Sequence, residues 1–353
     1  MYDASDNNFQ DNGIIGPDRQ LNPHAWEVRY IYQSVWTSMA DAGKKTVRIF
    51  NENFFCDLSA YYLEWELIAD GEVLQKGIAS DIQAGPQQSV ELAIPYDASM
   101  VSDGREWFLN VSYKLKKSEQ LLPAGYTVAY NQIELAGYDF PELSISNRNE
   151  VNCEASVPEI VTNDRFYLIV KGENFVLDFS RKDGFISYYE VDGHSMLAED
   201  SEIRPNFWRA PTDNDYVANL QHKYGVWKNP NFRLKSLEGS MKDGLSEIRA
   251  EYDIMETQTK LYLTYVVNNA GEIHVTQKMV AGPSTEIPEM FRFGMVMQMP
   301  LEYDTVEYYG RGPVENYADR NNSTLVGLYR QTVEEQFYPY IRPHETGTKT
   351  DLR

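Results

Sequence analysis

The sequence has little cysteine and histidine, and this limits the sites that it can build. Its 353 residues include 2 cysteines, Cys56 and Cys153, and 5 histidines. The cysteines are far apart, so they are either unpaired thiols or one disulfide, and a thiolate metal site would lack ligands. The histidines form neither an HxH nor an HExxH array, which argues against a zinc site.

Long apolar runs and basic charge are also scarce. No stretch approaches about 18 consecutive apolar residues, so no membrane span is expected, and no signal-like start is visible. Lys and Arg number 32 against 53 Asp and Glu, which gives a net charge of −21. Such a surface repels nucleic acid and anionic lipid, so both are excluded as default partners, whereas neutral sugars are unaffected.

Several familiar catalytic motifs do not occur. The sequence has no GxSxG elbow, no Walker loop and no GxGxxG fingerprint, and its "GRGP" at 310–313 predicts a turn rather than a phosphate cradle. Nucleotide-dependent chemistry and a serine nucleophile are therefore not indicated.

What the sequence has in quantity is alternating hydrophobicity broken by turns. In "REWFLNVSYKLKK" (105–117), Trp107, Leu109, Val111, Tyr113 and Leu115 fall on one face, with mostly polar residues on the other. The dipeptide at 70–71, Asp-Gly, supplies the positive φ angles of a tight hairpin. Many short strands with regular turns predict an all-β protein built of β-sandwiches.

Composition also suggests domain boundaries. Residues 37–136 have the size of an immunoglobulin-like sandwich, and 137–164 are polar and predict a linker. A larger β unit runs from 165 to 353. Before the first sandwich, "AWEVRYIYQSVW" (25–36) could form a short helix or a leading strand.

The candidate sites are two clusters of carboxylates, Asp213 with Asp215 and Glu315 with Asp319. Paired carboxylates could serve glycoside hydrolysis as acid and nucleophile or base. Each cluster also holds arginines, and arginine–carboxylate forks fasten loops together, so a structural or interface role is favoured over sugar contact. We expect Arg209 to pair with a carboxylate such as Glu315 or Glu345. The candidates are Arg209, Asp213, Asn214, Asp215, Arg311, Glu315, Asn316, Asp319, Arg320 and Glu345.

Three long segments carry a family resemblance. The segments "RPNFWRAPTDND" (204–215), "YYGRGPVENYADR" (308–320) and "PYIRPHETGTKTDLR" (339–353) resemble signature segments of the last domain of glycoside hydrolase family 2 β-galactosidases. A fourth, "NGIIGPDRQLNPHAWEVRYIYQ" (12–33), resembles the passage from the family's catalytic barrel into its fourth domain. The matches occur in the family's order and cover essentially the whole chain.

The resemblance implies an identity for each part of the chain. Residues 1–36 would be the tail of the catalytic barrel with its connector, and 37–136 the immunoglobulin-like fourth domain. After the linker at 137–164, residues 165–353 would be the N-terminal part of the last, small-chain domain. That domain is expected to be a galactose-mutarotase-like β-supersandwich that continues beyond the given sequence.

The implied activity is retaining hydrolysis of terminal β-D-galactosides. In the family the acid/base and nucleophile glutamates lie in the preceding barrel, so we expect no catalytic residue here and a non-catalytic part that supports the barrel. The first alternative is a stand-alone carbohydrate-binding module. The second is a self-contained enzyme that uses Glu315 with Asp213 or Asp319.

The resemblance also bears on ions and partners. Phe9 and Asn12 match residues that help to bind sodium near the family's substrate, and their remaining partners would lie in the barrel. No cofactor is expected in this chain alone, although a full-length enzyme could hold Na⁺ and Mg²⁺. The expected partners are a galactoside, through the full-length enzyme, and the missing barrel. The oligomeric state and the cellular compartment are left open.

Overall fold

The computed structural model describes residues 13–102, 104–148, 157–282 and 287–353. It confirms the all-β prediction: the chain consists mainly of antiparallel sheets with few short helices. Two compact units form, one from Met1–Pro141 together with Thr305–Arg353, and the other from Glu142–Asp304. None of the helices in the described ranges is long and apolar enough to cross a membrane.

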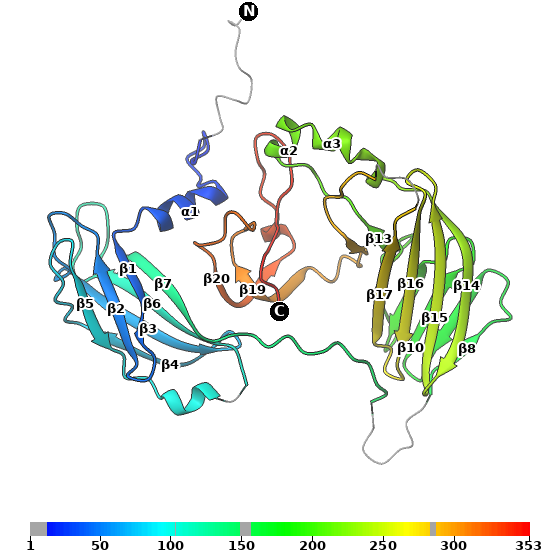
Figure 1. Cartoon of the computed structure of the whole chain (residues 1–353), viewed down its shortest axis with the longest axis horizontal. Helices are drawn as coiled ribbons and strands as arrows, with labels where there is room; N and C mark the ends of the chain where they lie inside the picture. The colour runs from blue at the N-terminus through cyan, green and yellow to red at the C-terminus, as the bar shows by residue number, and fades with distance from the viewer. Residues whose placement is uncertain (1–12, 103, 149–156, 283–286) are drawn as a thin grey trace, which may run out of the picture. The chain divides into compact units, whose positions relative to one another are not determined.

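The first unit contains a seven-stranded sandwich preceded by a helix (Figure 1). Its sheets have the strand orders β1-β2-β5 and β4-β3-β6-β7. Residues 25–36 form both expected elements in turn, because the helix ends before the first strand begins. The elements are α1 (Pro23–Ile31), β1 (Val35–Asp41), β2 (Thr46–Asn51), β3 (Tyr61–Ala69), β4 (Glu72–Ala79), β5 (Ser89–Ala93), η2 (Ala98–Ser102), β6 (Trp107–Leu115) and β7 (Thr127–Ala136).

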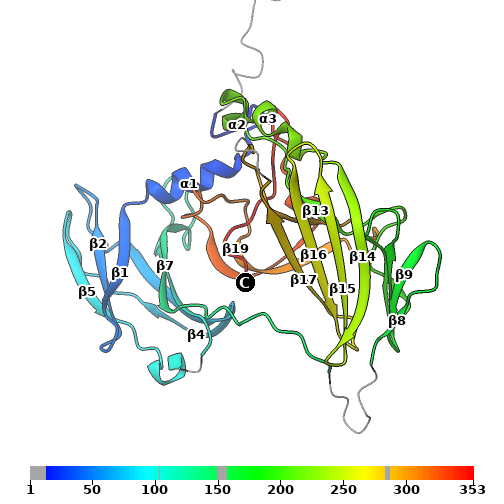
Figure 2. The ribbon, with the colours of Figure 1, turned by 45° about the vertical axis from the view of Figure 1, so that its right-hand side comes forward.

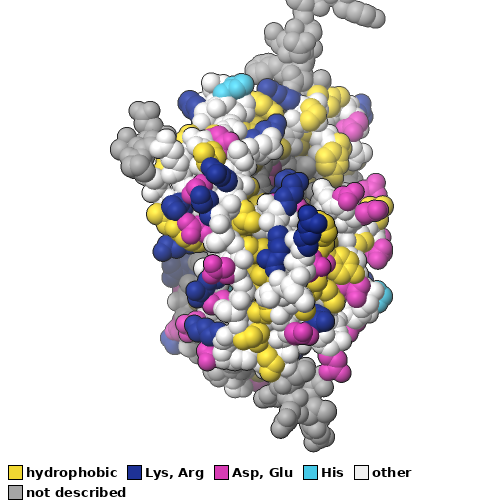
Figure 3. Space-filling view, turned by 90° about the vertical axis from the view of Figure 1, so that its right-hand side faces the viewer, with side chains coloured by type: hydrophobic (Ala, Val, Ile, Leu, Met, Phe, Trp, Pro, Cys, Tyr) yellow, Lys and Arg dark blue, Asp and Glu magenta, His cyan; other side chains and the backbone are white. Residues whose placement is uncertain are grey.

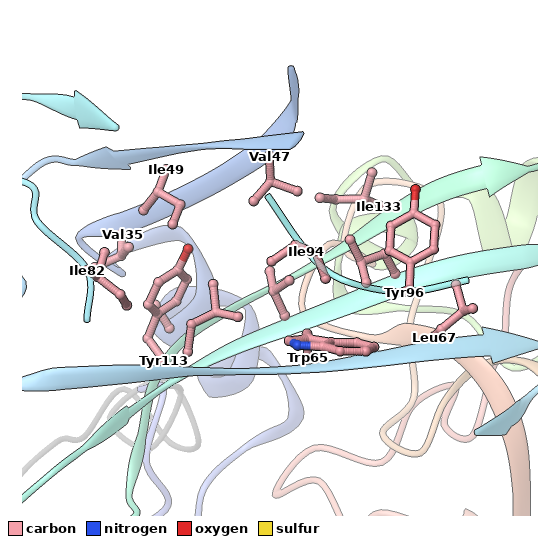
Figure 4. Packing of buried hydrophobic residues seen from close by; sticks show 14 of the residues in the cluster. Val35, Val47, Ile49, Trp65, Leu67, Ile82, Ile94, Tyr96, Tyr113 and Ile133 are labelled. Atoms are coloured by element: carbon pink, nitrogen blue, oxygen red, sulfur yellow. The ribbon is translucent and has the colours of Figure 1, made fainter. Parts of the chain in front are cut away.

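The core of this sandwich follows the predicted alternation. On β6 the side chains of Trp107, Leu109, Val111, Tyr113 and Leu115 are all buried. Figure 4 shows apolar side chains from both sheets pointing into the same space. The predicted hairpin at 70–71 is also present, with positive φ at both residues. Burial of such side chains contributes about 1.5–3 kcal/mol each.

The second unit contains a further sandwich. Its sheets have the orders β12-β11-β10-β9-β8 and β14-β15-β16-β17, and β13 pairs with β18. The four long strands β14 to β17 form one continuous sheet (Figure 2). The elements are β8 (Glu159–Val161), β9 (Tyr167–Lys171), β10 (Phe175–Ser180), β11 (Ile186–Val191), β12 (His194–Ser195), β13 (Arg204–Asn206), α2 (Asp213–Val217), α3 (Leu220–Lys223), η3 (Gly225–Trp227), β14 (Phe232–Lys242), β15 (Leu245–Ile254), β16 (Thr259–Val267), β17 (Ile273–Val280) and β18 (Gly294–Val296).

The outward side of the long sheet carries charges of both signs. Lys260 on β16 lies 2.7 Å from Glu251 and 3.8 Å from Asp253, both on β15. Figure 3 shows basic and acidic side chains interspersed over one face of the molecule. The excess of acid is therefore not gathered into one large acidic patch on that face.

The chain then returns to the first unit. The hairpin of β19 (Thr305–Gly312) and β20 (Leu325–Thr332), the short helix η4 (Glu334–Gln336) and the residues after it all belong there. The sequence-based boundaries placed 165–353 in a single domain, whereas in the structure Thr305–Arg353 packs with Met1–Pro141. The domain boundaries themselves stay a prediction.

Candidate functional site

The returning hairpin covers the outer face of the sandwich. Ile68 on β3 and Phe108 on β6 point away from the main core, yet each is only 5% exposed, because Val326 of β20 and Tyr309 of β19 pack on them. The alternation of β6 predicted a solvated face here. It missed this cover because the covering strand lies about two hundred residues further along the sequence.

Buried polar groups fix the hairpin in register. The side-chain amide of Gln132, on β7, donates to the carbonyl of Val326 and accepts from its N–H, both at 2.8 Å. The amide thus forms with Val326 the pair of hydrogen bonds that the backbone of a neighbouring strand would form. Nearby, Tyr130 donates its hydroxyl to the carbonyl of Ser323 at 2.7 Å.

Helix α1 holds the turn between β19 and β20. Glu27 is 7% exposed, and its carboxylate accepts from the backbone N–H groups of Asn322 at 3.1 Å and Ser323 at 2.9 Å. Burial by itself raises the pKa of Glu27, but these and neighbouring hydrogen bonds outweigh it and hold the pKa below its ordinary value.

The last described residue is fastened to the sandwich as well. Arg353 forms a two-point ion pair with Glu106, with nitrogen–oxygen distances of 2.8 and 3.1 Å. The hydroxyl of Tyr309 donates to the same carboxylate at 2.6 Å. Glu106 is 1% exposed, so its charge is stabilised by partners rather than by water.

Glu315 is the centre of the C-terminal segment. One carboxylate oxygen accepts from Arg320 at 2.9 Å and from the hydroxyl of Tyr340. The other accepts from the hydroxyl of Thr346 at 3.0 Å and from the N–H of Gly347 at 2.8 Å. Burial by itself raises the pKa of Glu315, but these four donors outweigh it and lower the pKa.

Asn316 completes the same arrangement. It is fully buried; its amide oxygen accepts from the N–H and hydroxyl of Thr350, and its NH₂ donates to the carbonyls of Arg311 and Val314. Arg311 in turn pairs with Asp351 at 2.5 Å. The signature segments 308–320 and 339–353 are thus held to each other by side chains that recognise backbone.

The segment 204–215, in the second unit, braces its own sandwich. Phe207 is 1% exposed in the core of that unit and contacts Trp227 and Phe293 with ring centroids 5.6 and 5.4 Å apart. Thr212 and Asp215 form a reciprocal capping box at the start of α2. The segment's two prolines restrict the backbone and favour this conformation.

The partner of Arg209 corrects the expectation from sequence. We expected Glu315 or Glu345, but the guanidinium lies 2.6 Å from the Asp215 carboxylate, six residues away, and 4.5 Å from the ring centre of Phe291. Because Asp215 is only six residues from Arg209, bringing the two together costs little chain entropy. The pair also supports the cap of α2.

The remaining candidates are divided between the two units and differ in burial. Asp213, Asn214 and Asp319 are exposed, whereas Glu345 is 9% exposed and accepts from the hydroxyl of Thr348. Phe9 and Asn12 lie outside the described residues, so their role in binding sodium stays a prediction. Within the described ranges, no group of three or more His, Cys, Asp and Glu side chains could hold a metal ion.

The arrangement around Glu315 is suited to fastening rather than to proton transfer. Both of its oxygens are occupied, and its pKa is lowered, whereas a general acid at neutral pH needs a raised one. The alternative pairing of Glu315 with Asp319 gains no support, because Asp319 is exposed and forms no hydrogen bond or ion pair with another described residue.

A small hollow opens beside Glu315. It has a volume of about 220 Å³ and lies between α1, the end of β20 with η4, and the C-terminal segment. The lining residues differ in character: aromatic rings, one lysine, and carboxylates and amides that are mostly already hydrogen-bonded. They are Leu21, Pro23, Trp26, Pro313, Val314, Glu315, Gln331, Glu335, Gln336, Phe337, Tyr338 and Lys349.

Sequence reasoning missed four residues that position this site: Glu27, Glu106, Gln132 and Arg353. Each finds its main partner at least 190 positions away along the chain. A polar residue at such a position carries no local signal. One signal was present in the sequence. Glu106 directly precedes the apolar strand β6, and a carboxylate at the edge of a core needs a cation or hydrogen-bond donors.

Comparison with known protein families gives two matches. Residues 171–353 match the family described as "Beta galactosidase small chain", and residues 47–136 match "Beta-galactosidase, domain 4". The second range falls within the seven-stranded sandwich, and the first includes β10 to β20 and the segment around Glu315.

Individual relatives agree with these matches. Over 99% of its length the chain is similar to proteins named β-galactosidase from Priestia megaterium (33% identical), Halalkalibacterium halodurans (27%) and Lactobacillus delbrueckii subsp. bulgaricus (28%). The chain spans about one third of the length of each of these curated relatives.

Proposed function

Because this chain belongs to the β-galactosidase small-chain family, we propose that it is the non-catalytic C-terminal portion of a β-galactosidase. In that enzyme it supports the part that cleaves terminal β-D-galactosides with retained configuration. The support is mechanical: loops are held in place at the edge of two sandwiches.

One observation carries the proposal: the carboxylates in the signature segments, and Glu106, which pairs with Arg353 of one such segment, hold parts of the chain together. Glu315 accepts four hydrogen bonds, Glu106 is locked to Arg353, and Asp215 is paired with Arg209. Carboxylates used in this way position backbone, and retaining hydrolysis needs a different arrangement, two facing carboxylates about 5–5.5 Å apart.

The test is hydrolysis of a chromogenic β-D-galactoside by the purified chain. A full-length β-galactosidase from a relative serves as the positive control, assayed in the same buffer with Na⁺ and Mg²⁺. We expect no turnover above the rate in buffer. Turnover by the chain that Glu315→Gln abolishes would refute the non-catalytic assignment.

A second function, direct contact with carbohydrate, is favoured by the hollow beside Glu315. Trp26, Phe337 and Tyr338 line it together with amide side chains, and small-molecule sites combine apolar walls with a few polar groups in this manner. Titration of the chain with D-galactose, followed by changes in tryptophan fluorescence, tests for this contact.

A further inference from the structure

Among the described residues, Lys349 is the one lysine in the wall of the hollow beside Glu315. We propose that this hollow is a subsite for an acidic saccharide, in which Lys349 binds the carboxylate and Trp26 packs against the sugar ring. The inference rests on the carbohydrate contact proposed above and specifies the class of ligand.

The ammonium of Lys349 has no acceptor among the described residues. It is half-buried, and among the described residues it forms no hydrogen bond or ion pair; its contact is with the ring of Tyr308, 5.8 Å from the ring centre. Removing part of the water from a cation without supplying an acceptor costs free energy. Burial accordingly lowers the pKa of Lys349, and an incoming carboxylate would restore the missing partner.

Among the described residues, neither carboxylate in the wall forms an ion pair with Lys349. Glu315 uses both oxygens for four other donors. Glu335 accepts from the N–H and the hydroxyl of Thr332 with one oxygen, at 2.8 and 3.1 Å. The charge of Glu315 raises the pKa of Lys349, but burial outweighs this effect.

The wall also contains further donors without an acceptor, beside the second carboxylate oxygen of Glu335 and the amide oxygen of Gln336, which accept no hydrogen bond from a described residue. Gln331 accepts from Tyr308 and Gln336 with its amide oxygen, which leaves its NH₂ for a ligand. The indole N–H of Trp26 has no acceptor among the described residues. A wall that offers an ammonium, an amide NH₂ and an indole N–H suits a ligand rich in acceptor oxygens, such as a carboxylate with hydroxyl groups.

The size of the hollow favours a single sugar unit over an acidic peptide. Its volume of about 220 Å³ is smaller than the roughly 300–1,000 Å³ of sites for drug-sized ligands. Trp26 and Phe337 supply apolar surface, against which the C–H face of a pyranose ring can pack. An extended peptide would instead need a free sheet edge or a longer groove.

The experiment is a calorimetric titration of the whole chain with D-galacturonate, using D-galactose and acetate as matched probes. Galactose has the ring without the charge, and acetate has the charge without the ring. We expect galacturonate to bind at least about tenfold more tightly than either probe. Lys349→Gln should remove this preference and Lys349→Arg should keep most of it.

A control variant, Lys117→Gln, changes an exposed lysine outside the hollow and should bind as the parent does. Melting curves for each variant show whether it folds; if Lys349→Gln does not fold, Trp26→Leu replaces it and should weaken galacturonate binding at least about tenfold.

Each alternative outcome has a distinct meaning. Equal binding of galactose and galacturonate overturns the charge requirement but keeps the carbohydrate contact. Equal binding of acetate, or tighter binding of an acidic peptide, overturns the saccharide assignment. Binding of none of these probes overturns both the inference and the carbohydrate contact, while the non-catalytic role is decided separately by the hydrolysis assay.

Discussion

A single carboxylate, Glu315, accepts hydrogen bonds from four residues of the C-terminal segment, and the effect of removing it should be measurable. Glu315→Gln should lower the free energy of unfolding at pH 7 by about 1–3 kcal/mol, because it weakens four hydrogen bonds to a buried side chain and removes the charge opposite Arg320. Urea denaturation measures this loss. Asp319→Asn, an exposed neighbour, is the control and should change little.

The same variant gives a pH dependence of known sign. The pKa of Glu315 is lower in the folded protein than in the unfolded chain, where it is about 4.3. The stability that Glu315 contributes is thus fully present above this value and is lost as the pH falls through the folded pKa. The difference between the parent and Glu315→Gln should shrink below about pH 4; a constant difference would contradict the assignment.

Arg209 gives a prediction for the second unit. Its side chain is 20% exposed and that of Asp215 is 9% exposed, so Arg209→Ala leaves a largely buried carboxylate without its cation. We expect a loss of about 1–3 kcal/mol in the free energy of unfolding. Arg204→Ala, an exposed arginine in the same segment, is the control. Equal melting temperatures for the two variants would show that the ion pair does not stabilise segment 204–215.

The distance between partners along the chain separates the contacts that sequence could indicate from those that it could not. Arg320 follows Glu315 by five residues and Asp215 follows Arg209 by six, so their segments could be recognised as arginine–carboxylate clusters. Arg353 and Glu106 are 247 residues apart. Nothing local marks such a pair, since its geometry exists only after two distant segments have folded together.

Strand β7 holds strand β20 through a side chain, and this contact can be tested. Gln132→Met has a similar shape but leaves both the N–H and the carbonyl of Val326 without their partner. We expect a loss of about 1–3 kcal/mol and faster hydrogen exchange of the Val326 amide. Glu134→Gln, exposed on the same strand, should leave the exchange rate unchanged. An unaltered Val326 amide in Gln132→Met would refute the role of the side chain.

The strands were easier to predict from the sequence than the segments that pack against them. The inward face of β6 follows from alternation alone, because burial on one side requires a period of two. Phe108 and Ile68 interrupt that pattern on the outer face, and the reason is the cover by Val326. Residues 25–36 allowed a helix or a strand. Pro23 at the start of α1 supports the helix, and the apolar residues from Val35 onward form the strand.

The first compact unit depends on a segment that is remote in sequence. A chain that ends at Asp304 would uncover Ile68 and Phe108 and would leave the buried carboxylate of Glu106 without Arg353 and Tyr309. We expect such a chain to melt several degrees lower in its first sandwich and to bind a hydrophobic dye more strongly. Glu106→Gln should rescue part of the stability lost in the shortened chain, because it removes the unpaired charge. Unchanged melting would show that the hairpin is not needed.

The return of the chain from the second unit to the first has a consequence for synthesis on the ribosome. The residues that close the outer face of the first sandwich are made after all of Glu142–Asp304. During that interval the nascent protein carries an uncovered apolar patch, and the carboxylate of Glu106 lacks Arg353 and Tyr309. Such a stage is open to aggregation and to chaperone binding. Codon changes that slow translation between 142 and 304 should therefore lower the yield of folded protein more than the same changes after 305.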